Sequence, residues 1–342
     1  MIDPLGQQPL PITGTAGPDL SDPTLVERVN ALKQRFAGIW ISYEPQEAIM
    51  AKVRQYMAET RGVRGVPIGG RRLSQETQAG KSALAWRLKA DLAKEREAAG
   101  LPPNLHQVVI VTIEKFQTLK AFYLQILAQL GDDFLDLRRR EGVRPGQKAA
   151  DPSKLTLPVL EQRIKEWCAR LEVELLVVDE VQRLDRASDE NDAVTVRLQT
   201  FLDRGIVPLL LIGNGKSPAF FRKNQDFAAR LGNPLVLPRL VCAKKGDADT
   251  EMFKKFSGDF AEALVVSGAV HVRAGLTSLE MIDALHQVSQ GHVGRVARLL
   301  EQAFEFTAER GALTIEPYDL SKVTRGYAID AGWVDSDPFS KP

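Results

Sequence analysis

Hydrophobic residues in the middle of the chain gather into short continuous runs, separated by stretches with helical periodicity. A strand-length apolar run without alternation indicates a strand buried on both faces. Strands of this kind are predicted at Gln107–Ile113, Glu174–Val178 and Val207–Ile212, and helices at Ser82–Ala98, Leu119–Leu130, Leu155–Leu171 and Asn191–Arg204. The alternation of these segments predicts an α/β core in which helices flank a parallel sheet.

The two ends of the chain have different patterns. The first residues are rich in proline, glycine and threonine, and two helical patterns follow with an interruption near 40–45. After residue 246 only helical patterns occur, at Met252–Val266, Leu279–Ser289, Val293–Arg310 and Glu316–Tyr327. These patterns divide the chain into a flexible N-terminal arm (1–24), a helical segment (25–60), the α/β core (61–242), a small helical lid (243–328) and a flexible tail (329–342).

The amino-acid composition indicates where the protein is located in the cell but says little about its function. The 342 residues are 44% hydrophobic and 26% charged, which is ordinary for a soluble protein. No apolar run reaches the roughly 18–20 residues that cross a membrane. The two cysteines, Cys168 and Cys242, lie far apart, so a cytoplasmic protein without a membrane partner is expected. The 45 basic and 44 acidic residues nearly cancel, which leaves nucleic-acid binding open.

The first motif with chemical meaning is QETQAGKS, at residues 75–82. Its end, Gly80-Lys81-Ser82, matches the phosphate-loop pattern GxxxxGK[ST], whereas Gln75 stands at the position of the first glycine. Glycine lets the backbone approach a phosphate closely, and the amides that open the following helix bind the anion. The motif therefore predicts an ATP site with nucleotide contacts at Gln75, Glu76, Thr77, Gln78, Ala79, Gly80, Lys81 and Ser82.

A second motif lies about 100 residues further on, where the apolar run Leu175–Val178 ends in Asp179-Glu180. Parallel sheets bind ligands at the carboxyl ends of their strands, so these acids are expected near the phosphate loop. Asp179 and Ser82 would hold Mg²⁺, and Glu180 would orient or deprotonate the attacking water. A solvated acidic turn is the simpler alternative, but the order and spacing of the two motifs favour the catalytic interpretation.

Three further residues are candidates because of their positions. Asn214 follows the strand Val207–Ile212, where a side chain can contact the γ-phosphate or attacking water, although turn residues are also common there. Arg230 is a candidate arginine finger, which stabilises transition-state charge in a neighbouring subunit, and a surface ion pair is the alternative. Arg222 and Arg239 are the other candidates for this role, and Arg295 opens a lid helix where a second phosphate sensor would lie.

With these positions in this order, the chain resembles the AAA+ ATPases and is most similar to TniB/TnsC-type regulators of DNA transposition. The stretches that carry the resemblance are Trp40-Ile41-Ser42-Tyr43-Glu44-Pro45, ETQAGKS, LLVVDEVQRL and GHVGRVARLLEQAFEFTAERG. The resemblance implies an ATPase that uses ATP and Mg²⁺. It implies catalytic roles for Lys81, Glu180, Asn214 and Arg230.

The same resemblance implies partners. A homo-oligomer, as a ring or helical filament, would assemble on double-stranded DNA and recruit a transposase, with a targeting protein as a further partner. Basic residues would contact DNA phosphates, and the candidates are Lys115, Lys120, Arg138, Arg139, Arg140, Arg144 and Lys148. Two alternatives stay open: another DNA-remodelling, loader or defence ATPase of the AAA+ class, and a nucleotide-gated scaffold with little hydrolysis, which Gln75 would allow.

Overall fold

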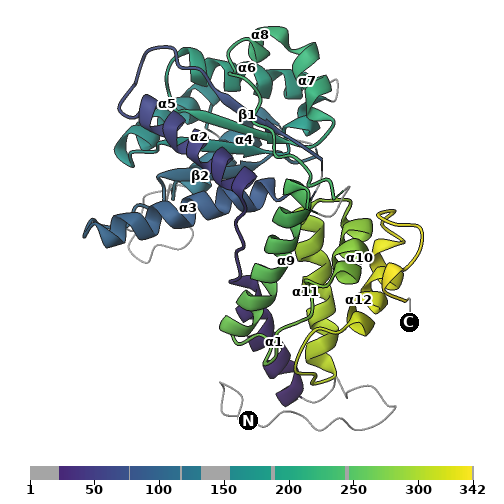
Figure 1. Cartoon of the computed structure of the whole chain (residues 1–342). Helices are drawn as coiled ribbons and strands as arrows, with labels where there is room; N and C mark the ends of the chain where they lie inside the picture. Colours follow the sequence, from purple (N-terminus) through teal and green to yellow (C-terminus); the bar gives the residue numbers. More distant parts are fainter. Residues whose placement is uncertain are drawn as a thin grey trace. The chain divides into compact units, whose positions relative to one another are not determined.

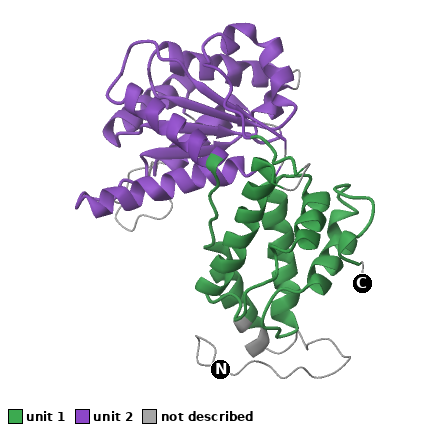
Figure 2. Ribbon diagram, viewed as in Figure 1, with its two compact units in different colours: residues 1–44, 238–342 green, residues 45–237 purple. Residues whose placement is uncertain are grey.

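The computed structural model describes residues 23–76, 78–115, 118–131, 155–185, 189–242 and 246–340. The chain forms two compact units, one of residues 45–237 and one that joins residues 1–44 to residues 238–342 (Figure 2). The helical segment expected over 25–60 is therefore divided, since its first helix belongs to the C-terminal helical unit and its second helix to the sheet-containing unit.

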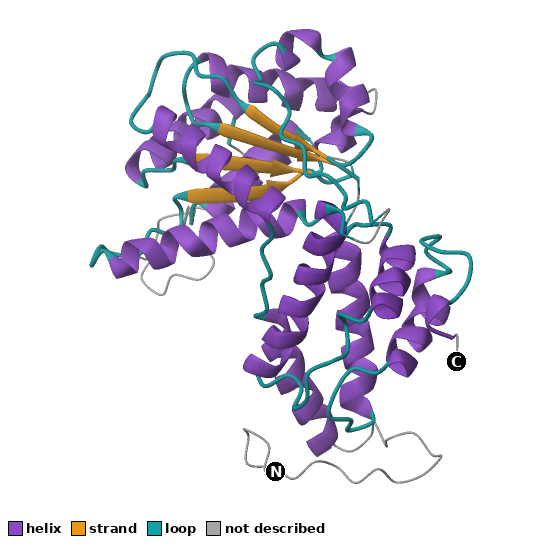
Figure 3. Cartoon of the chain, viewed as in Figure 1, coloured by secondary structure: helices purple, strands orange, loops and turns teal. Residues whose placement is uncertain are grey.

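Within the described part of residues 45–237, parallel strands form a four-stranded sheet in the order β1-β4-β3-β2 (Figure 3). The strands are β1 (Arg71–Ser74), β2 (Val108–Thr112), β3 (Leu175–Asp179) and β4 (Leu209–Gly213). Every residue of β3 and β4 is buried, as their continuous apolar sequences predict. At the outer edge of β1, bridges from Gly70 to Leu231 and from Leu73 to Leu235 continue the parallel pairing.

Helices cover both faces of this sheet (Figure 1). One hydrophobic core cluster joins Leu176 and Val178 of β3 to side chains of α4, α5 and α6, including Phe122, Ile164 and Phe201. On the opposite face, the hydroxyl of Tyr56 in α2 accepts a hydrogen bond from the amide of Leu209 at 3.1 Å. The helices of the unit are α2 (Glu44–Thr60), α3 (Lys81–Ala98), α4 (Leu119–Gln129), α5 (Leu157–Arg170), α6 (Asp189–Asp203), α7 (Ser217–Lys223) and α8 (Gln225–Ala228), with the short 3-10 helix η3 (Val181–Asp185) after β3.

The second unit is built from helices. Phe36 of α1 packs against Phe260 and Phe304, with ring centroids 5.7 and 5.3 Å apart, and so joins the N-terminal helix to the C-terminal helices. No helix among the described residues is long and apolar enough to span a bilayer. The helices are α1 (Pro23–Ala37), α9 (Ala248–Val266), α10 (Leu279–Ser289), α11 (Val293–Glu309) and α12 (Pro317–Val323), followed by the turns η4 (Thr324–Ala328) and η5 (Pro338–Ser340).

The flexible tail expected over 329–342 is corrected as far as Ser340, because this segment packs within the helical unit. The side chain of Trp333 is only 5% exposed, and that of Phe339 is 9% exposed. The carboxylate of Asp337 accepts hydrogen bonds from Ser321 Oγ at 2.6 Å and Arg325 Nε at 2.7 Å. The buried rings of Trp333 and Phe339 and the hydrogen-bonded carboxylate of Asp337 therefore hold this segment in place, although its polar composition predicts flexibility.

Candidate nucleotide site

The phosphate-loop sequence connects β1 to α3 across the carboxyl edge of the sheet. The amide of Gln75 still bonds to the carbonyl of Gly213 in β4, at 3.2 Å, so the loop leaves the sheet only after this residue. Gly80 precedes α3 with a φ of 83°, and a Cβ there would lie 3.1 Å from Gln46 Nε2. Gly80 is therefore required both by its left-handed backbone and by the close side chain. Thr77 lies outside the described residues.

Lys81 is the first residue of α3, and its side chain turns back over the loop. The ammonium donates to the carbonyl of Glu76 at 2.6 Å, and the residue is 8% exposed. Burial lowers the pKa of Lys81 below its ordinary value, against the opposing effect of the nearby carboxylates of Asp179, Glu180 and Glu76. A buried cation whose desolvation is not fully offset favours the binding of an additional anion.

Ser82 and Asp179 meet although 97 positions separate them in the sequence. The Ser82 hydroxyl donates to Asp179 Oδ2 at 2.5 Å, while Asp179 Oδ1 accepts from the amide of Glu180 at 2.7 Å. A serine hydroxyl and an aspartate carboxylate are hard oxygen ligands, the kind that Mg²⁺ prefers. The donor set at the junction of α3 and β3 therefore fits this metal.

Glu180 has an unusual backbone and an engaged side chain. Its φ is 63°, in the left-handed region that non-glycine residues rarely adopt. Its carboxylate accepts a hydrogen bond from Gln182 Nε2 at 2.9 Å and pairs with Arg183 at 3.0 Å. The sequence interpretation missed Gln182 and Arg183, although their positions in the tight turn directly after Glu180 were a usable signal.

Asn214 lies within the same hydrogen-bond network. Its amide donates to Gln182 Oε1 at 3.0 Å, so Gln182 connects Glu180 on β3 to the end of β4. Its side-chain oxygen accepts from the amide of Lys216 at 2.9 Å, as in an Asx turn. The turn role proposed as the simpler alternative is thus present, while the Nδ2 group has no partner among the described residues.

The finger candidates differ in their surroundings. Arg230 donates from Nε to Asp203 and from Nη1 to the carbonyl of Asp226, each at 2.5 Å, and the hydrogen bond to Asp203 raises the pKa of Arg230 above its usual value. Arg222, on α7, is exposed and has no ion pair within the described residues. The surface ion pair proposed as the alternative for Arg230 is present.

Arg239 and Arg295 belong to the helical unit, whereas the phosphate loop belongs to the other unit. Arg295 donates to Gln290 Oε1 at 3.1 Å, and its guanidinium lies 5.3 Å from the ring centroid of Trp333. These contacts fix the direction of the Arg295 side chain within its own unit. Its role as a phosphate sensor stays a prediction.

Only two of the residues predicted to contact DNA lie among the residues that the structure describes. Lys115 follows β2 near the carboxyl edge of the sheet and is exposed, and Lys120 lies in the first turn of α4. The other basic candidates lie outside the described residues: Arg138, Arg139, Arg140, Arg144 and Lys148.

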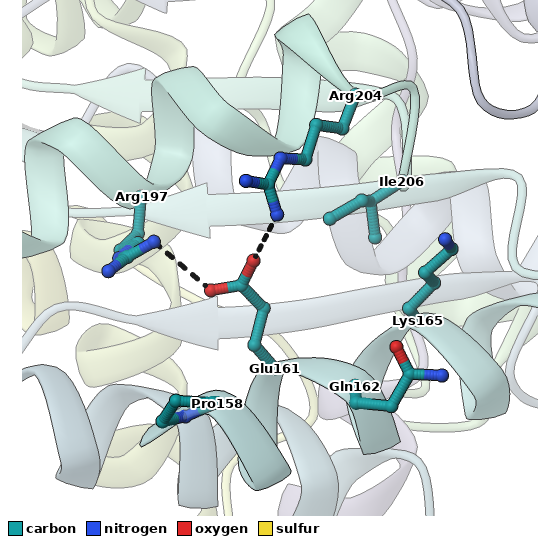
Figure 4. A pocket seen from close by; sticks show the side chains of 7 residues that line it. All are labelled: Pro158, Glu161, Gln162, Lys165, Arg197, Arg204 and Ile206. Carbon is teal, nitrogen blue, oxygen red and sulfur yellow. Dashed lines mark hydrogen bonds and ion pairs between the residues drawn. The ribbon is translucent and has the colours of Figure 1, made fainter.

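A separate pocket of about 280 Å³ lies between α5 and α6 (Figure 4). Its central Glu161 accepts hydrogen bonds from Arg197 at 3.3 Å, Arg204 at 3.1 Å and the Tyr123 hydroxyl at 2.9 Å. None of the residues predicted to bind nucleotide lines this pocket. Because the carboxylate is saturated by its own chain, the cluster is explained as an ion-pair network between two helices.

Comparisons with known proteins agree with the architecture. Residues 75–217, from the phosphate loop to the start of α7, match the model of a family described as an AAA domain. No curated protein matches the sequence.

The solved structures that are similar to the chain include three that match it over 86% of its length. The ORC1 protein of Aeropyrum pernix, solved in complex with DNA, is 15% identical, has a TM-score of 0.54 and is covered over 69%. The ORC2 protein of the same organism in its ADP form is 14% identical, with a TM-score of 0.55 and 72% covered. Cdc6p from Pyrobaculum aerophilum is 12% identical, with a TM-score of 0.53 and 70% covered.

The chain therefore has the P-loop AAA+ fold, as the sequence predicted. Similarity at these identities establishes the fold alone, and together with the matched AAA domain it supports an AAA+ ATPase. The narrower resemblance to TniB/TnsC-type regulators stays a prediction.

Replacing Lys81 by alanine removes the only ammonium described at the loop. Losing charge-assisted hydrogen bonds of about 3 kcal/mol is expected to weaken ATP binding roughly 100-fold in isothermal titration calorimetry. Lys89→Ala, two turns further along α3, is the matched control and should bind ATP normally. Unchanged affinity in Lys81→Ala would remove the phosphate-loop assignment.

The finger candidates can be separated by single substitutions. Arg230→Ala is expected to bind ATP normally but to lose roughly 10³-fold in steady-state turnover, the lower range for an arginine finger. Arg222→Ala is the parallel variant, and thermal unfolding of both variants controls for the loss of the Asp203 ion pair. Full turnover in Arg230→Ala together with its loss in Arg222→Ala would transfer the role to Arg222.

Proposed function

We propose that the chain is an AAA+ ATPase that binds Mg-ATP at the α3–β3 junction and couples its hydrolysis to action on duplex DNA. The proposal of nucleotide binding rests on the 2.5 Å hydrogen bond from Ser82 to Asp179. Ser82 directly follows the buried Lys81 in the sequence. Two distant sequence motifs meet there in the order that a magnesium triphosphate site requires.

The chemistry assigned to the residues follows from their positions. Lys81 and the first amides of α3 would bind the β- and γ-phosphates, and Ser82 and Asp179 would hold Mg²⁺, which when bound neutralises phosphate charge. Glu180 would accept a proton from the attacking water. Its pairing with Gln182 and Arg183 keeps its carboxylate beside the strand ends, and Asn214 is connected to it through Gln182.

The arginine-finger role implies assembly of several copies, because a finger completes the site of a neighbouring subunit. The Aeropyrum pernix ORC1 protein, which shares the fold, was solved in complex with DNA, and this supports a DNA-associated role here. Lys115 and Lys120 are the described candidates for phosphate contacts. We propose a homo-oligomer, as a ring or filament, on double-stranded DNA.

The finer proposal is regulation of transposition, in which the DNA-bound oligomer recruits and activates a transposase, with or without a targeting protein. It rests on the sequence resemblance to TniB/TnsC-type ATPases. The second candidate is another DNA-remodelling, loader or defence ATPase of the AAA+ class, because the similarity of the fold to ORC and Cdc6 proteins does not favour transposition. A scaffold with little hydrolysis is the third, because Gln75 replaces the first glycine of the loop.

Glu180→Gln tests hydrolysis. The amide keeps the size of the side chain and one acceptor oxygen, but it loses the negative charge and cannot act as a base, so ATP binding should persist while turnover falls by roughly 10²-fold or more. Electron micrographs with duplex DNA and ATP should then show longer-lived assemblies than the unmodified chain forms. Equal turnover in the two proteins would favour the scaffold.

DNA binding is tested by its dependence on salt. Affinity for a labelled duplex in the presence of a slowly hydrolysed ATP analogue should fall steeply between low and physiological salt. Lys115→Ala and Lys120→Ala should each reduce the slope by about one, independently of sequence. Lys94→Ala, exposed on α3, is the matched control, and salt-insensitive or absent binding would contradict the DNA-associated proposal.

A further inference from the structure

A cavity of about 550 Å³ lies within the helical unit, between the start of α10, the start of α12 and η5. Pro338 and Phe339, which belong to the segment expected to be a flexible tail, form part of its wall. We call this cavity the α10 groove and define it by Glu280, Met281, Asp283, Pro317, Pro338 and Phe339.

The charge of the α10 groove is one-sided. Two of its ten lining residues are acidic and none is basic. Glu280 and Asp283 lie three positions apart on α10, so they share one face of the helix. Neither carboxylate has an ion pair or a side-chain hydrogen bond among the described residues, whereas Asp319 and Asp337 in the same unit are both paired with arginines.

The rest of the α10 groove is mixed, because apolar Met281, Pro317, Pro338 and Phe339 lie beside polar Ser278 and Gln287, and the wall formed by η5 is held in place. The amide of Phe339 donates to Asp337 Oδ1 at 2.9 Å, and Asp337 is in turn fixed by Ser321 and Arg325. Outside the groove, the neighbouring residues Leu279 and Tyr318 are 51% and 63% exposed. The apolar residues of the groove thus lie next to exposed apolar side chains, an arrangement that marks binding surfaces.

The chemistry of the α10 groove selects its ligand. Phosphate groups are repelled by two unpaired carboxylates, so nucleic acid and nucleotide are disfavoured. A lysine or arginine can lie with its methylene groups on apolar surface while its charged end reaches a carboxylate. We propose that the α10 groove docks a basic peptide segment of a partner protein, in which arginine or lysine residues flank a leucine-like side chain. This inference does not depend on ATP binding.

The test uses short fluorescein-labelled peptides and the full chain. A peptide of alternating arginine and leucine should bind in fluorescence anisotropy, and the same peptide with glutamate for arginine, or serine for leucine, should not. Glu280→Lys is expected to weaken binding roughly tenfold or more, the scale of reversing a charge beside a docked cation. Phe339→Ala should weaken it by a similar factor through lost apolar contact.

Glu251→Lys is the matched control, because Glu251 is also an exposed acid in the first turn of a helix, α9, but does not line the groove. Its affinity should equal that of the unmodified chain, as should that of Lys81→Ala. Equal weakening by Glu251→Lys and Glu280→Lys, binding that survives the leucine-to-serine change, or no peptide binding at all would each overturn the proposal. Binding of labelled duplex DNA, measured without peptide and weakened by Phe339→Ala, would indicate a nucleic-acid ligand and overturn the proposal as well.

Discussion

The contact between Ser82 and Asp179 is the interaction on which the rest of the nucleotide site depends. It joins the first turn of α3 to the end of β3 across β4, which lies between β1 and β3 in the sheet. The contact exists because parallel strands bring their carboxyl ends to a single edge. The apolar residues of β3 and β4 therefore hold Ser82 and Asp179 in contact, although they take no part in the hydrogen bond itself. Disrupting these strands would separate the two side chains.

The charges at this edge of the sheet fit the proposed binding of an anion. Lys81 is desolvated and held by a neutral carbonyl, while the nearby acids point at oxygen and nitrogen donors of their own chain. In the α10 groove, by contrast, the carboxylates of Glu280 and Asp283 have no ion pair with a basic side chain among the described residues. The two sites therefore differ, because the Lys81 ammonium lies among the carboxylates of Glu76, Asp179 and Glu180.

Much of the fold was accessible from the sequence, because β3 and β4 are buried on both faces and their apolar runs leave little alternative. β1 is harder to predict, since Arg71 and Arg72 are typical of a surface segment and only one of its four residues, Leu73, is buried. The allocation of α1 to the C-terminal helices depends on Phe36 meeting Phe260 and Phe304, a long-range packing choice without a local signal. The paired state of Arg230 also had no local signal, because Asp203 lies 27 positions away.

Four non-glycine residues have left-handed backbones, among the described residues: Gln78, Glu172, Glu180 and Gln290. Gln290 is the C-cap of α10 and Glu172 follows the C-cap of α5, and such a conformation is routine at helix ends. Gln78 and Glu180 instead flank the phosphate site, each at a cost of about 1–3 kcal/mol. Glycine at either position would relax the backbone and raise thermal stability. In the proposed ATPase, the longer side chains at these two positions would lower thermal stability in exchange for the orientation of the groups around the phosphates, and a screen for heat-resistant variants would tend to select glycine there.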